Sequence, residues 1–123
     1  MRRSHAFVSF ISAAALMVLP VQALADQIEG QYSGASSIAG GTGECWGNNP
    51  ASAVVTGGTV TIRYVAYEGT QSILTADVHP DGTFSLSQPI KNGSISYSGK
   101  IRGNRLTAQW KGPVCYGTLD MTR

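Results

Sequence analysis

The sequence has few of the side chains on which most catalytic and metal sites depend. It contains two histidines, His5 and His79, and two cysteines, Cys45 and Cys115. Its seven acidic residues are scattered along the chain, and none lies in an apolar run that would raise its pKa. The glycine-rich stretches GGTG and GG precede no helical pattern, so neither predicts a phosphate-binding loop. These absences predict a protein without catalytic residues, without a metal site and without a cofactor.

His79 is the one histidine beyond the N-terminal segment, and two reactive residue types lie near it. Asp77 shares its parity, and pairing with the next segment would bring Ser85 to the same face. All three fall on the outward, polar parity beside a tight turn, where nothing would exclude water or stabilise an oxyanion. We therefore expect His79 to be a surface residue and the protein not to be an enzyme.

An excess of charge of one sign is also lacking. The chain has nine lysines and arginines and seven acidic residues. Arg2 and Arg3 lie in a segment expected to be removed, which leaves seven basic residues against seven acidic ones. A neutral domain lacks the basic surface that nucleic acids and anionic membranes attract, so partners of these classes are not expected.

The first 25 residues predict a secretory signal peptide. A positive start at Arg2 and Arg3 is followed by the apolar run AFVSFISAAALMVLPVQ and by the small residues Ala23 and Ala25. The arginine pair also allows a twin-arginine signal, but the residues after it fit ordinary Sec export better. We expect cleavage after Ala25, one domain over residues 26–123, and a periplasmic or secreted product. No membrane anchor is expected, because no cysteine follows the cleavage site and no later apolar run approaches the ~18 residues of a membrane span.

Because the protein is expected to be exported, its two cysteines are predicted to have a structural role. In an oxidising compartment Cys45 and Cys115 are expected to form a disulfide. The bond would close a loop of about 70 residues, for which chain entropy predicts about 4 kcal/mol of stabilisation. A metal–thiolate pair or a reactive thiol would require neighbouring ligands or an activating base, and the sequence shows neither.

Alternation of apolar and polar residues dominates the chain from Ala53 onward. It is clearest in GSISYSGKIRGNRLTAQW, residues 93–110, and recurs in TVTIRYVAY, SILTADVH, TFSLS and VCYGTLDM. Such alternation is typical of strands with one buried and one solvated face. We expect an all-β fold of about eight antiparallel strands in an up-and-down barrel whose first and last strands pair, with an open β-sandwich as the alternative. No helix is expected beyond the N-terminal segment.

The segment ASSIAGGTGECWGNNPAS, residues 35–52, shows no regular period and is predicted to be a long loop held in place by Cys45. Trp46 follows this cysteine, and Asn48 and Asn49 lie just beyond, so an aromatic anchor is surrounded by adaptable polar groups. Tyr116, which points outward beside the second cysteine, completes the predicted binding surface. The alternative role of Trp46 is to plug the end of the barrel.

A GxYxG opening strand, hairpins containing DGTF and GNRLTAQW, and a cysteine in the last strand characterise residues 28–122. In these features the chain resembles small exported bacterial calycin-like barrels, a group that includes avidin-like proteins and periplasmic inhibitors of proteases and of lysozyme. The resemblance implies a fold and a compartment. No stretch matches a biotin site or an inhibitory loop, so no residue roles are carried over.

Taken together, these observations predict a non-enzymatic binding module, for example an inhibitor of an envelope or secreted hydrolase. The alternative is a carrier of a small apolar or aromatic ligand inside the barrel. An eight-stranded barrel can be filled by side chains or can retain space for one ligand. The inward positions include large residues such as Tyr64, Tyr97 and Trp110 and small ones such as Ala76 and Gly99, so the pattern leaves both interiors open.

Overall fold

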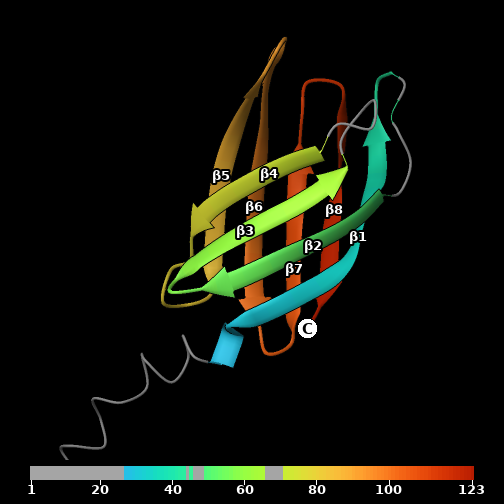
Figure 1. Cartoon of the computed structure of the whole chain (residues 1–123). Coiled ribbons are helices and arrows are strands. Elements are labelled where there is room, and N and C mark those ends of the chain that lie inside the picture. Colours follow the sequence, from blue (N-terminus) through green and yellow to red (C-terminus); the bar gives the residue numbers. More distant parts are fainter. Residues whose placement is uncertain (1–26, 44, 46–48, 66–70) are drawn as a thin grey trace, which may run out of the picture.

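The computed structural model describes residues 27–43, 45, 49–65 and 71–123, and every regular element from Gly30 onward is a β-strand (Figure 1). The strands are β1 (Gly30–Gly41), β2 (Asn49–Thr56), β3 (Thr59–Val65), β4 (Gln71–Asp77), β5 (Thr83–Ile90), β6 (Gly93–Arg102), β7 (Arg105–Lys111) and β8 (Cys115–Thr122). The predicted all-β fold of eight strands is confirmed. The predicted cleavage site after Ala25 lies outside the described residues. No helix in the described ranges has the length and apolarity to cross a bilayer.

The strands form one antiparallel sheet that curls into a nearly closed barrel. Their order in the sheet is β4-β3-β2-β1-β8-β7-β6-β5, so the first and last strands pair as predicted. Each strand also pairs with its neighbour in sequence, except at the β4–β5 connection, where no ladder forms. In Figure 1 the strands β1 to β4 cross in front of β5 to β8 at a large angle. The barrel is therefore continuous everywhere but between β4 and β5.

Strand β1 is longer than the sequence pattern predicts, and the expected loop over residues 35–52 is wrong at both of its ends. The strand continues to Gly41, with a register irregularity between Ile38 and Gly40, and β2 already begins at Asn49. Small residues form this strand because neighbouring backbones approach it closely. A Cβ on Gly34, for example, would collide with the backbone of β8. Pairing on both edges, rather than side-chain alternation, makes this segment a strand.

The inward faces of the strands form a single apolar core, and the predicted inward parities of β3 to β8 are confirmed. Its most buried large side chains, each less than 2 % exposed, are Tyr32, Phe84, Ile62, Leu106, Leu119, Met121, Val55 and Val60. At one end Tyr32 donates a hydrogen bond to the Ile28 carbonyl (2.6 Å), and the guanidinium of Arg123 lies 5.8 Å from the Tyr32 ring. Burial of this apolar surface is the main stabilising contribution to the fold.

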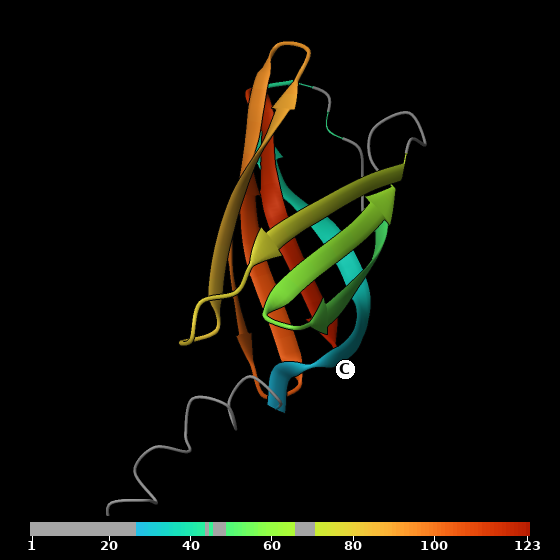
Figure 2. The same cartoon turned by 60° about the vertical axis from the view of Figure 1, so that its left-hand side comes forward.

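The two ends of the barrel differ in what they carry. The first described residues and the C-terminus lie together at the lower end in Figures 1 and 2. The β5–β6 and β7–β8 turns and the end of β1 lie at the opposite end. Because this second end also carries the disulfide, it is called the disulfide end below.

Candidate binding site at the disulfide end

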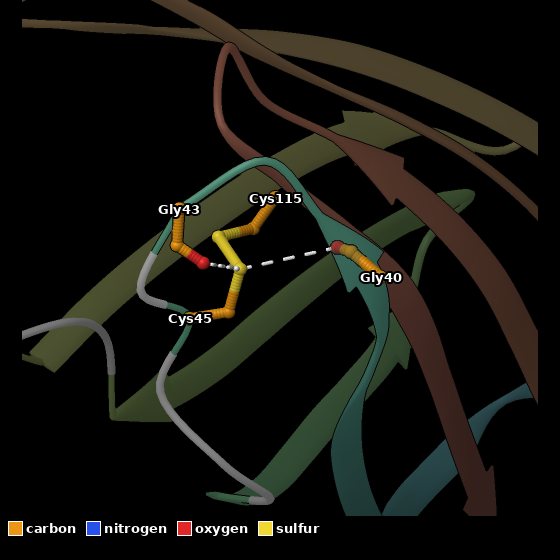
Figure 3. The surroundings of a disulfide bond; sticks show 4 residues. All are labelled: Gly40, Gly43, Cys45 and Cys115. Atoms are coloured by element: carbon orange, nitrogen blue, oxygen red, sulfur yellow. Dashed lines mark hydrogen bonds between the residues drawn. A yellow bond between two sulfur atoms is a disulfide. The ribbon is translucent and has the colours of Figure 1, made fainter.

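The predicted disulfide between Cys45 and Cys115 is present (Figure 3). It joins residues 70 positions apart, with a Cα–Cα distance of 5.9 Å, inside the usual range for a bridged pair. Cys115 is the first residue of β8 and lies opposite Gly41, the last residue of β1. The bond therefore fastens the segment that follows β1 to the start of β8. A Cβ at Gly41 would meet the Cys45 sulfur at 2.5 Å, so glycine leaves the room that the bridge occupies.

Two carbonyl oxygens approach the sulfur of Cys45. The Sγ atom lies 3.6 Å from the oxygen of Gly43 and 3.9 Å from that of Gly40 (Figure 3). A disulfide sulfur carries no proton, so it donates no hydrogen bond to either oxygen. These are packing contacts that enclose the bridge within the turn.

Backbone hydrogen bonds hold the remaining chain at this end. The amide of Thr42 donates to the carbonyl of Val114 (2.9 Å), which links the end of β1 to the β7–β8 connection. Within that connection the amide of Gly112 donates to the carbonyl of Cys115 (2.8 Å). The β5–β6 turn lies against the same connection, because a Cβ at Gly93 would be 3.1 Å from the Pro113 ring. Three segments distant in sequence thus form one braced surface.

This surface exposes apolar side chains. Among the described residues five large hydrophobic side chains are exposed, and three of them belong to this end: Ile90 (39 %), Val114 (48 %) and Tyr116 (50 %). We call these three residues the apolar rim. The charges beside it are positive, since Lys91 lies in the β5–β6 turn and Lys111 ends β7. The described parts of the three segments contain no acidic residue.

One residue of the rim, Tyr116, also lines a hollow on the outer face of the sheet. The hollow has a volume of about 570 Å³ and is lined by Ala39, Ser96, Tyr97, Ser98, Gln109, Trp110, Lys111, Tyr116, Gly117 and Thr118. A second hollow of about 500 Å³ lies farther along the same face and shares Ser98, Gln109 and Thr118 with the first. These three residues are in register across β6, β7 and β8. The residues shared by the two hollows thus form a row of hydroxyl and amide groups across three strands, and Lys111 and Tyr116 line the first hollow beside this row.

The structure places two of the four predicted binding residues. Tyr116 points outward as predicted, and its ring covers Gly40, where a Cβ would collide with the phenol. Asn49 is half-buried and opens β2 opposite Ser36, so it belongs to a strand rather than to the expected loop. Trp46 and Asn48 lie outside the described residues. Ile90 and Val114 are not among the predicted binding residues, and their signal in the sequence is an apolar residue directly beside a turn.

A second group of polar atoms lies on the inward faces of β3, β5, β6 and β7, where Tyr97 is buried and the other three residues are half-buried. The rings of Tyr64 and Tyr97 meet edge to face at 6.5 Å, their hydroxyls are hydrogen-bonded, and the Tyr97 hydroxyl lies 3.5 Å from Oε1 of Gln88. Burial, and then the hydrogen bond with Tyr64, raise the pKa of Tyr97. Near them the Nε1 atom of Trp110 is buried and has no hydrogen-bond partner among the described residues. We call these four residues the interior polar group.

The structure assembles no catalytic arrangement from the residues considered earlier. Asp77, His79 and Ser85 are all exposed, and β4 and β5 do not pair as that grouping would require. The amide of His79 instead donates to the carbonyl of Thr83 within the turn (2.8 Å). In the described ranges no three histidine, cysteine or acidic side chains gather where they could hold a metal ion.

No known protein family, curated protein or solved structure matches this chain.

Proposed function

We propose that this protein is a non-enzymatic binding module of an extracytoplasmic compartment and that it binds a protein partner through the apolar rim. The observation that carries the proposal is that three half-exposed apolar side chains lie at one braced end, Val114 and Tyr116 on either side of Cys115 and Ile90 at the end of β5. Apolar side chains grouped on a surface mark interaction sites, whereas scattered ones do not. The signal-peptide pattern and the disulfide support the compartment.

Rigidity of the rim favours tight binding. The disulfide and the Thr42–Val114 hydrogen bond fix the segments that carry it before any partner arrives. A preorganised surface loses less conformational entropy on association, so more of the contact energy appears as affinity. Tyr116 in particular is an aromatic anchor supported by the backbone at Gly40.

The charges around the rim indicate the kind of surface it fits. Lys91 and Lys111 flank the apolar side chains, so the complementary partner carries an apolar patch bordered by carboxylates. A periplasmic or secreted hydrolase is the partner class that the resemblance to calycin-like inhibitors implies. The resemblance is the basis for proposing a hydrolase as the partner, and the apolar rim is the surface proposed to contact it.

The test compares two substitutions that add the same charge at different places. Val114→Asp places a carboxylate in the rim, whereas Val54→Asp places one on β2, where Val54 is 42 % exposed outside the rim. Envelope extract is passed over each immobilised protein, the retained proteins are identified by mass spectrometry, and the dissociation constant of each is then measured. We expect the rim variant to weaken binding at least about tenfold and the β2 variant to bind like wild type. Equal binding by both variants, with both folded by circular dichroism, would refute the proposal.

A second candidate function is favoured by the interior polar group. A buried N–H without a partner costs about 1–3 kcal/mol, a cost that a ligand oxygen at Nε1 of Trp110 would remove. None of the four residues in the group is charged, so the fitting ligand is a small uncharged molecule with an apolar or aromatic body and a hydrogen-bond acceptor.

Native mass spectrometry of protein isolated from its own compartment tests this candidate. We expect an additional small mass on the wild type, reduced in Trp110→Phe, which removes the donor and keeps an aromatic ring. Tyr32→Phe is the matched control, because it removes a hydroxyl donor but keeps a ring at the opposite end of the barrel, and it should retain the mass. The bare polypeptide mass in wild-type material would exclude the carrier function.

A further inference from the structure

Strands β4 and β5 are the two free edges of the barrel sheet. They diverge from the turn that joins them, as Figures 1 and 2 show. At the turn the amide of Gly82 donates to the carbonyl of His79 (2.8 Å), and that of His79 donates to the carbonyl of Thr83 (2.8 Å). Beyond the turn no ladder joins the two strands.

The register of the β3–β4 pair shows which groups of β4 are unpaired. The amide of Val78 donates to the carbonyl of Gly58, so these two residues form a hydrogen-bonded pair. In an antiparallel ladder such pairs alternate with pairs whose backbone groups point away from each other. Counting along the register, the residues whose N–H and C=O face the open edge are Gln71, Ile73, Thr75 and Asp77.

The two edges differ in how well they resist further pairing. The same alternation on β5 makes Ser85, Ser87 and Pro89 the edge-facing residues, and Pro89 has no N–H to offer. Strand β4 contains no proline, no lysine and no arginine, and its register with β3 has no bulge. Prolines, basic side chains and bulges are among the features by which proteins protect edge strands, and β4 has none of these three. It also presents Ile73, which is 55 % exposed.

We propose that β4 pairs antiparallel with β4 of a second copy of this chain across a two-fold axis at Leu74. In this register all four edge-facing residues of each copy are hydrogen-bonded. Ile73 pairs with Thr75 of the partner subunit, and Gln71 pairs with Asp77 of the partner subunit. The result is a continuous sheet that runs through two barrels.

Self-complementarity is the reason to expect a second copy rather than an unrelated strand. The proposed register places no like charges opposite each other, because Asp77 is the one charged residue of β4 and it meets an amide. Ile73 lies opposite another β-branched side chain, Thr75 of the partner subunit. An isologous interface needs only one such patch, and β4 supplies it.

The test measures association of the full folded chain by analytical ultracentrifugation over a wide concentration range. Wild type is expected to shift from monomer to dimer as concentration rises. Ile73→Lys adds an edge charge, and Thr75→Pro removes an edge N–H that β3 does not use. Each is expected to weaken the dimer at least about tenfold. Val54→Lys is the matched control, because it adds the same charge to an exposed valine on a strand that is paired on both sides, and should dimerise like wild type.

Hydrogen exchange locates the contact independently of any variant. The amides of Ile73 and Thr75 are expected to exchange quickly in dilute protein and slowly in concentrated protein. A wild type that stays monomeric at every concentration overturns the proposal. So does a dimer that Ile73→Lys and Thr75→Pro leave intact, since its interface lies elsewhere. A monomer that still binds its partner through the rim would leave the proposed function standing.

Discussion

Removing the Cys45–Cys115 bridge should weaken the fold mainly through the unfolded state. The sulfurs close a loop of 70 positions between residues that are already held near each other by the β1–β8 ladder. Loss of the bond therefore removes few native contacts but releases the unfolded chain. The chain-entropy relation gives about 4 kcal/mol for this loop length. Each kcal/mol shifts the melting temperature of a domain of this size by roughly 4–8 °C, so a decrease of about 15–30 °C is expected.

The assay is thermal and urea unfolding of wild type with and without reductant, beside the variant with Cys45→Ser and Cys115→Ser. The reduced wild type and the double variant should agree, and reductant should not affect the variant. The dependence of the unfolding free energy on urea should become steeper without the bridge, because a freed chain exposes more surface. A melting temperature that changes by only a few degrees on reduction, or an unchanged urea slope, would refute the argument.

Three further predictions concern single side chains. Gly117→Ala should cost about 1–3 kcal/mol in urea unfolding with an unchanged slope, because a Cβ there collides with the Trp110 ring and the facing β1 backbone. The hydrogen bond and charge of Arg105 lower the pKa of Asp120, so NMR should show this carboxyl titrating below an ordinary aspartate and moving back in Arg105→Gln. The stability from that pair is present above the unfolded-state pKa and is lost as pH falls through the folded one. Burial raises the pKa of Tyr97, so the neutral phenol contributes its full stability below the ordinary tyrosine pKa and loses it as pH rises above that value. Unfolding free energies measured over an alkaline pH series should show this decline in wild type, and Tyr97→Phe should remove it.

Much of the fold follows from side-chain alternation. Segments such as Arg105–Lys111 place Leu106 and Ala108 inside and their neighbours outside, and two-residue periodicity alone is enough to identify them. The disulfide was predictable from the signal-peptide pattern and from the presence of just two cysteines. The late part of β1 could not be found in this way, because its serines, alanines and glycines carry no apolar signal. This part of β1 is a strand because its backbone is hydrogen-bonded to β2 and to β8, which are distant in sequence.

The sites were less predictable than the fold. Tyr116 was identified because it lies beside a cysteine on the outward parity. Ile90 and Val114 join it only because the disulfide and the turns bring residues from different hairpins to one end. Two further features depend on how the whole sheet curves: the Nε1 atom of Trp110, which has no partner among the described residues, and the open edge of β4. No local pattern in the sequence contains that information.

The β1–β8 ladder has a consequence for how the chain folds as it is made or exported. Residues 33–41 find their second strand only among residues 115–122, nearly at the other terminus. A chain that emerges from its N-terminus can form the β2–β4 meander early. The β1–β8 ladder, which joins β1–β4 to β5–β8, can form only after residues 115–122 have emerged. Contacts so distant in sequence slow folding, and a product that stops before β8 would expose the edges of β1 and β7 to aggregation in addition to those of β4 and β5.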